Sequence, residues 1–119
     1  QIPPIFSAKR VNGMRAYDLA RKGEIVNLYP KIVNIFEFNV KEYEYPNIKC
    51  EIVCSSGTYI RTLMHDLGKN LGSFGTAKGL RREGIGPFDV KDSLLSGEIS
   101  VSSVEKKIVD LDKVRELIL

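Results

Sequence analysis

The most informative local pattern is Cys54-Ser55-Ser56-Gly57-Thr58-Tyr59-Ile60-Arg61, a strand end followed by a turn of small residues and the start of a helix. Before it, apolar and polar residues alternate over 47–54, which predicts a strand. After it, apolar residues recur at helical spacing, which predicts a helix over 58–71. With a further strand predicted over 31–41, these elements indicate an α+β fold with an antiparallel or mixed sheet and flanking helices.

The rest of the chain adds shorter elements to this fold class. Asn12-Gly13 predicts a turn, and residues 14–22 predict a short helix that Gly23 ends. The remaining predicted elements are a strand over 74–83, a turn over 84–87 and helices over 89–95 and 111–119.

Composition restricts the class of protein. With 119 residues, 43% hydrophobic and 28% charged, the chain is expected to form one globular domain and not to be disordered. No apolar run approaches the roughly 20 residues of a membrane span, and no signal peptide is recognisable at the start. We therefore expect a cytoplasmic protein. The first residue is Gln1 and not Met, so we expect the chain to be processed or part of a longer one.

The two cysteines predict neither a disulfide nor a metal site. Cys50 and Cys54 lie on one face of the predicted strand, about 13 Å apart at strand rise, and a disulfide needs Cα atoms within about 7 Å. One histidine, His65, offers too few partners for zinc, and we expect it to be a polar residue on the exposed side of its helix. We interpret the cysteines as small core residues in a reducing compartment.

Positive charge is concentrated in two segments. Residues 1–22 carry five basic groups against one acidic, and residues 61–82 repeat the same balance, whereas the other two segments are net acidic. If the two basic segments converge on one face, they would bind a polyanion. Scattered, solvated charge is the alternative.

The strand–helix junction is a candidate binding site. A turn of small residues lets another backbone approach closely, and Tyr59 and Arg61 follow it in the first helical turn. An aromatic ring and a guanidinium there suit a stacked base and a carboxylate or phosphate. Alternatively, Tyr59 packs in the core and Arg61 forms a structural ion pair.

Two further segments combine basic residues with apolar or aromatic ones. Residues 6–17 interleave them around the predicted turn, which suits an RNA-contacting hairpin or loop. A solvated amphipathic helix is the alternative. In Leu80-Arg81-Arg82, two adjacent arginines on a strand would point to opposite faces, so at most one would face a ligand.

Three segments, in order, resemble the TruB family of tRNA pseudouridine synthases. They are Gln1-x-Pro3-Pro4-x-Phe6-Ser7-Ala8-Lys9 running into Asn12-Gly13-x-Arg15-Ala16-Tyr17, then Cys54 to Arg61 followed by Asp66-Leu67-Gly68, and Leu80-Arg81-Arg82 with Gly86 and Phe88. The resemblance implies an enzyme that isomerises uridine-55 of the tRNA T loop to pseudouridine, without metal or organic cofactor, after flipping the base out of the loop. Its partner would be the T-arm stem-loop of tRNA.

The resemblance also implies roles for individual residues. Tyr59 would pack against the flipped base, Leu80 would line the pocket beneath it, and Arg61 would pair with the catalytic aspartate. The family's RNA-binding insertion corresponds to the first basic segment. The residues expected to contact RNA are Lys9, Arg10, Arg15, Tyr17, Arg21, Lys78 and Arg82.

The family's aspartate motif, G-x-L-D-P-x-A-x-G, is not in this sequence. We therefore expect residues 1–95 to be the C-terminal part of the catalytic domain, with the RNA-contacting insertion over 1–23 and a helical extension over 96–119. The fragment alone should be inactive without its N-terminal half, and its exposed sheet edge should favour dimerisation or aggregation. The alternatives are a stand-alone RNA-binding module and a fragment of relatives that work with guide RNAs.

Overall fold

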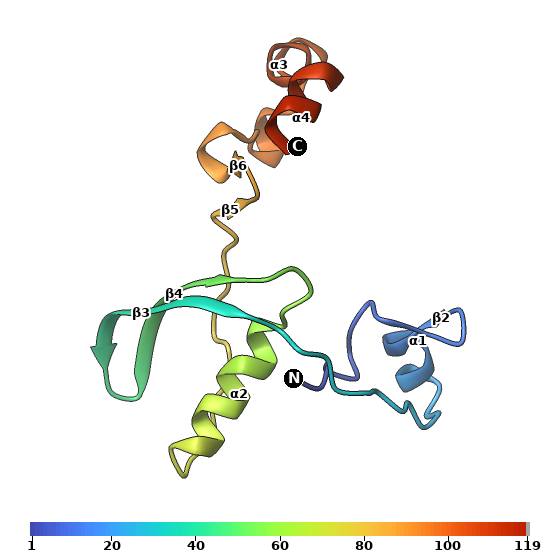
Figure 1. Cartoon of the computed structure of the whole chain (residues 1–119), viewed down its shortest axis with the longest axis vertical. Coiled ribbons are helices and arrows are strands. Elements are labelled where there is room, and N and C mark those ends of the chain that lie inside the picture. The colour runs from blue at the N-terminus through green and yellow to red at the C-terminus, as the bar shows by residue number, and fades with distance from the viewer. Residues whose placement is uncertain (119) are drawn as a thin grey trace. The chain divides into compact units, whose positions relative to one another are not determined.

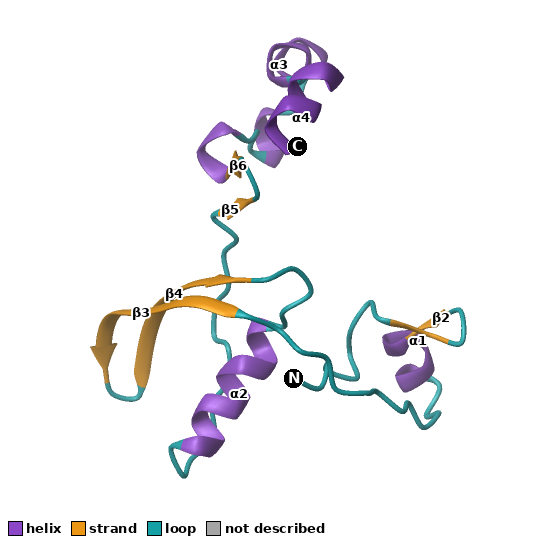
Figure 2. Cartoon of the chain, viewed as in Figure 1, coloured by secondary structure: helices purple, strands orange, loops and turns teal. Residues whose placement is uncertain are grey.

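The computed structural model describes residues 1–118 and divides into two compact units, residues 1–78 and residues 79 onward. The first unit holds a small hairpin with a helix, a longer antiparallel hairpin and a second helix (Figures 1 and 2). The second holds a short hairpin and short helices. This combination confirms the predicted α+β class.

The first hairpin pairs β1 (Arg10–Val11) with β2 (Met14–Arg15), and α1 (Ala16–Arg21) follows directly. Asn12 and Gly13 form its turn with φ of 50° and 84°, the pair of left-handed residues that a tight two-residue hairpin needs. The predicted turn is confirmed. The predicted helix over 14–22 begins two residues late, because Met14 and Arg15 pair with β1.

The small buried core of the first unit lies beneath this hairpin. Ala16 and Leu19 are buried on one side of α1, with Ser7 also buried. The N–H of Tyr17 donates to the Ser7 carbonyl at 3.1 Å, and the N–H of Ala16 donates to the Lys9 carbonyl at 2.7 Å. These bonds satisfy free donors at the start of α1 and tie the preceding segment to the helix.

The longer hairpin pairs β3 (Ile35–Glu44) with β4 (Asn47–Cys54) in antiparallel register, with Phe38 opposite Ile52. The β4 prediction is confirmed. The strand predicted over 31–41 is shifted towards the C-terminus, because pairing with β4 begins at Ile35 and continues to Glu44.

The two faces of this hairpin differ in chemistry. On one face, the pairs Lys41–Glu51 and Glu42–Lys49 form ion pairs at 2.6 and 2.8 Å. The other face is apolar and remains open: Val40 is 54% exposed. Cys50 and Cys54 are free thiols, as predicted, but they are half-buried and not core residues, because within the described residues this face stays exposed, as at Val40 opposite Cys50. The predicted dimer stays a prediction.

Helix α2 (Ile60–Asn70) confirms the helix predicted over 58–71. The segment after it turns back against the helix, and the Ser73 N–H donates to the Gly68 carbonyl at 2.9 Å. A Cβ at Gly68 would lie 2.6 Å from the Cα of Gly75, so the two backbones meet where neither residue has a side chain.

The strand predicted over 74–83 is therefore wrong. Phe74 and Gly75 pack on a helix, which offers no ladder of free backbone groups to pair with, and residues 74–83 form no strand. Arg81 and Arg82 are therefore not held on opposite faces as predicted, because that alternation requires a strand.

The second unit contains a short hairpin and short helical segments. β5 (Gly84–Ile85) pairs with β6 (Phe88–Asp89), so the turn predicted over 84–87 is confirmed at residues 86 and 87, whereas Gly84 and Ile85 are paired strand residues. The helix predicted over 89–95 is wrong in extent, because only a short 3₁₀ helix, η1 (Val90–Asp92), forms there. A second 3₁₀ helix, η2 (Ser96–Glu98), follows it.

Two α-helices complete the unit. α3 (Val101–Lys107) was not predicted, and Ser100 caps it by accepting the Ser103 N–H at 3.2 Å. α4 (Leu111–Ile118) confirms the last predicted helix up to its final residue, Leu119, which lies outside the described residues. Within the described chain, no helix is long and apolar enough to cross a membrane.

Candidate functional site

Hydrogen bonds within the turn and to the segment before β3 hold the turn between β4 and α2. The N–H of Ser55 donates to the Asn34 carbonyl at 2.9 Å, and its hydroxyl accepts the Asn34 N–H at 3.0 Å. The Thr58 hydroxyl donates to the Ser55 carbonyl at 2.8 Å. Gly57 has φ of 77°, a left-handed conformation that favours glycine. The sequence pattern of small residues thus forms the turn it predicts.

Tyr59 lies between this turn and the helix, with extended backbone and a half-buried side chain. Its N–H donates to Oε1 of Gln1 at 2.9 Å, and its carbonyl accepts from Nε2 of Gln1 at 3.0 Å. The alternative, that Tyr59 packs in the core, is met only in part, because part of its side chain remains accessible.

Arg61 is exposed and lies two residues after Tyr59, in the first turn of α2. Its Nη2 donates to the Phe6 carbonyl at 2.9 Å, and it forms no ion pair with any described residue. The alternative of a structural ion pair is therefore wrong within residues 1–118. Because the described contact occupies one nitrogen of the guanidinium, Arg61 retains donors for a carboxylate or phosphate.

A second cluster surrounds the Tyr17 ring. The guanidinium carbons of Arg15 and Arg21 lie 5.9 and 5.5 Å from the ring centroid, within cation–π range. Nη1 of Arg15 also donates to the Tyr17 hydroxyl oxygen at 3.0 Å. This hydrogen bond, followed by the charge of Tyr17, raises the pKa of Arg15 above its usual value. The ring and two cations form a platform suited to nucleic acid.

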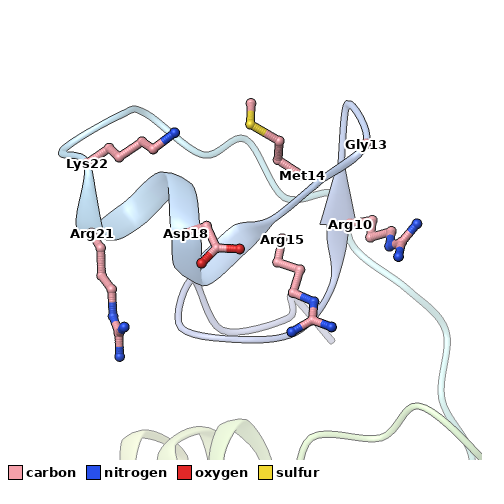
Figure 3. A pocket seen from close by; sticks show the side chains of 7 residues that line it. All are labelled: Arg10, Gly13, Met14, Arg15, Asp18, Arg21 and Lys22. Carbon is pink, nitrogen blue, oxygen red and sulfur yellow. The ribbon is translucent and has the colours of Figure 1, made fainter.

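This cluster borders a hollow of about 600 Å³. Figure 3 shows the Arg15 and Arg21 side chains extending the same way from the hairpin and from α1. The hollow carries four cations against one carboxylate, and its lining residues are Arg10, Gly13, Met14, Arg15, Asp18, Arg21 and Lys22. A concentration of arginine and lysine around a hollow attracts a polyanion such as an RNA backbone.

The structure therefore groups only some of the predicted site residues. Arg15 and Arg21 lie around the Tyr17 ring, and both line the hollow together with Arg10. Lys9 is exposed in the segment before β1. Lys78 is exposed at the end of the first unit, whereas Leu80, 65% exposed, and Arg82 belong to the second. The roles of these last three residues stay predictions.

Sequence reasoning missed two residues that contribute to these sites. Lys22 lines the hollow, and its place in the first basic segment could have indicated this. Gln1 binds the backbone of Tyr59, 58 positions away, and no local pattern signals such a contact. Among the described residues, no group of three or more His, Cys, Asp or Glu side chains could hold a metal ion.

The family model described as TruB family pseudouridylate synthase (N terminal domain) matches residues 1–60, half of the chain. The chain belongs to the TruB family. That model describes an N-terminal domain, so the placement of residues 1–95 as the C-terminal part of a TruB catalytic domain is not confirmed and stays a prediction.

Curated TruB relatives match most of this chain. It is 46% identical over 113 residues to tRNA pseudouridine synthase B of Parabacteroides distasonis, which covers 95% of this chain and 48% of the relative. It is 41% identical over 116 residues to the Thermotoga maritima enzyme, an alignment that covers 98% of this chain and 38% of the relative. It is 53% identical over 94 residues to the Bacteroides fragilis enzyme, an alignment that covers 79% of this chain and 40% of the relative. The chain thus spans about two-fifths to one half of the length of these relatives.

Proposed function

We propose that this chain is the part of a tRNA pseudouridine synthase that holds the T arm of tRNA and presents Tyr59 and Arg61 to the reacting nucleotide. The substrate would be uridine-55 of the T loop, isomerised to pseudouridine in the cytoplasm. The observation that carries the proposal is that one unit contains both the cationic hollow, which Arg15 and Arg21 line, and the exposed Arg61 that follows Tyr59.

In this proposal Tyr59 and Arg61 act on the reacting centre. The accessible part of the Tyr59 ring would pack against the flipped base. Arg61, oriented by the Phe6 carbonyl, would form an ion pair with an aspartate that this chain does not supply. A guanidinium beside a carboxyl group lowers the pKa of that group, so the aspartate would stay ionised and correctly oriented.

The cationic hollow would bind phosphates of the T arm. Arg10, Arg15, Arg21 and Lys22 surround it, and Asp18 offsets only part of their charge. Since such contacts release counterions, they should make affinity strongly dependent on salt. The Tyr17 ring, which lies close to two guanidinium groups, would offer a stacking surface for a base.

A binding experiment tests the RNA-contacting role. Affinity for a T-arm stem-loop is measured between 50 and 200 mM salt for the chain, for Arg15→Gln and for the matched control Arg115→Gln in the second unit. Loss of one phosphate contact should reduce the slope of log affinity against log salt by about 0.7–0.9. Only Arg15→Gln should show that loss. Equal slopes in all three proteins would contradict the proposal.

An activity experiment tests the catalytic role. Tritium release from tRNA labelled at the carbon where the base is reattached is measured for the whole product of the native gene and for the 119-residue chain. The whole product should turn over and the chain alone should not, because its sequence lacks the catalytic aspartate motif. Turnover by the chain alone would refute the assignment. Binding without turnover by the whole product would favour a stand-alone RNA-binding module.

A further inference from the structure

We infer that Gln1 is a positioning residue that sets the placement of Tyr59 in the proposed reaction, and that the segment Gln1–Phe6 aligns Arg61 with it. The inference rests on the proposed function, because it assumes that Tyr59 and Arg61 meet the substrate. Nothing in the sequence pattern of Gln1 predicts it. The inference comes from hydrogen bonds that join residues far apart in the chain.

The side-chain amide of Gln1 binds the backbone of Tyr59 at both of its polar groups. Oε1 accepts the Tyr59 N–H at 2.9 Å, and Nε2 donates to the Tyr59 carbonyl at 3.0 Å, in a partly buried setting. That carbonyl also accepts the Leu63 N–H at 3.0 Å, the first hydrogen bond of α2. A carboxamide carries a donor and an acceptor side by side, so glutamine can bind the N–H and the carbonyl of one residue together.

The backbone of Gln1 is anchored as well. Its carbonyl accepts the Lys31 N–H at 2.8 Å, and its nitrogen donates to the Lys31 carbonyl at 2.8 Å. Nζ of Lys31 in turn donates to the Ser56 carbonyl, at 3.4 Å, in the turn before Tyr59. These bonds fix the backbone of Gln1 relative to Lys31 and the turn, so its side chain can in turn fix the backbone of Tyr59.

The segment Gln1–Phe6 then connects Tyr59 with Arg61 and with the hollow. Pro3 and Pro4 restrict its backbone, and Pro3 is buried. Its last carbonyl, that of Phe6, accepts from Arg61, and the next carbonyl, that of Ser7, accepts from the start of α1. One stiff segment thus touches both groups proposed to meet the nucleotide and the helix that carries the cationic hollow.

The expected consequence is a loss of rate without a loss of binding. Without the two side-chain bonds, the Tyr59 backbone can shift, and a displacement of about 1 Å at a reacting centre costs up to about 100-fold in rate. The cationic hollow would be untouched, so KM should change little. We expect Gln1→Met to lower kcat by about 10- to 100-fold with KM within about twofold.

The test uses two variants in the whole product of the native gene. Gln1→Met keeps the length of the side chain but removes both hydrogen bonds, so it separates hydrogen bonding from space filling. Gln1→Glu keeps the acceptor for the Tyr59 N–H but, when ionised, has no donor for the Tyr59 carbonyl, so it isolates the bond from Nε2. Both should lower kcat.

A spectroscopic measurement accompanies the kinetics. The protein is labelled with 3-fluorotyrosine, and the ¹⁹F resonance of Tyr59 is assigned from the Tyr59→Phe variant. In both Gln1 variants this resonance should shift or broaden, whereas that of Tyr17 should not move and thereby shows that the unit is folded.

The outcomes separate the two proposals. A wild-type kcat together with an unchanged Tyr59 resonance in Gln1→Met would overturn the inference, and so would a fall in kcat in which the Tyr17 resonance moves as much as that of Tyr59. If the wild-type product binds no tRNA and converts no uridine, the proposed function fails, and the inference fails with it.

Discussion

Replacing Gly68 by alanine should loosen the segment that packs on α2. The added Cβ would lie 2.6 Å from the Cα of Gly75 and from the carbonyl carbon of Phe74, and the Gly75 nitrogen is in hard contact as well. Carbon atoms pack at roughly 3.5 Å or more, so the segment must move by about 1 Å. All three obstacles are backbone atoms and cannot rotate away.

The size of the effect follows from two opposing contributions. Overpacking a tight contact costs about 1–3 kcal/mol, and the rigid backbone obstacles place Gly68→Ala at the upper end. Alanine recovers about 1 kcal/mol of helix propensity relative to glycine. The net loss in the free energy of unfolding is about 2 kcal/mol. For a unit of 60–100 residues this lowers Tm by about 8–16 °C.

Thermal unfolding followed by far-ultraviolet circular dichroism measures this effect. Gly79→Ala is the matched control, because nothing lies within 4 Å of its Cβ position and its backbone is not left-handed. The control should stay within about 0.5 kcal/mol of the parent. If Gly68→Ala melts at the same temperature as Gly79→Ala or above it, the packing of residues 73–75 on the helix is refuted.

Two smaller predictions concern titratable groups. Burial raises the pKa of the Cys50 thiol, so at pH 8 it should react with iodoacetamide more slowly than a model thiol, and equal rates would show that the site is open. The N–H of Lys91 donates to the Asp89 carboxylate at 2.9 Å and, followed by the Lys91 side chain, lowers the pKa of Asp89. Because the pKa of Asp89 is lower in the folded state, its ionised form contributes to folding stability. That contribution is present above the pKa of the unfolded state and is lost as pH falls through the pKa of the folded state. The Lys91 amide resonance should follow that loss in NMR spectra, and a matching transition in Asp89→Asn would contradict the assignment.

Local patterns determined the elements that depend on neighbouring residues. The alternation over 47–54 and the helical spacing after Tyr59 led to β4 and α2, since strand and helix periodicity are properties of the chain itself. Asn12-Gly13 led to the first turn for the same reason, because both residues tolerate positive φ. The missed α3 carried a local signal in Ser100, a serine at the cap position.

The errors occurred where distant segments decide the outcome. Residues 74–83 read as a strand by composition, but strand formation needs a partner edge, and Gly75 instead meets Gly68 on a helix. The cysteines alternate onto an apolar face, and whether that face is covered depends on what packs against it.

For the candidate site, the sequence alone indicated the residue types and the family, because residue identity and motif spacing do not depend on how the chain folds. Only the tertiary structure brought Arg15 and Arg21 within cation–π range of the Tyr17 ring and joined Gln1 to Tyr59. Hydrogen bonds and charge pairing act over a few ångströms, so they depend on which segments folding brings together. The order of residues along the chain does not directly give the distance in space between two such segments.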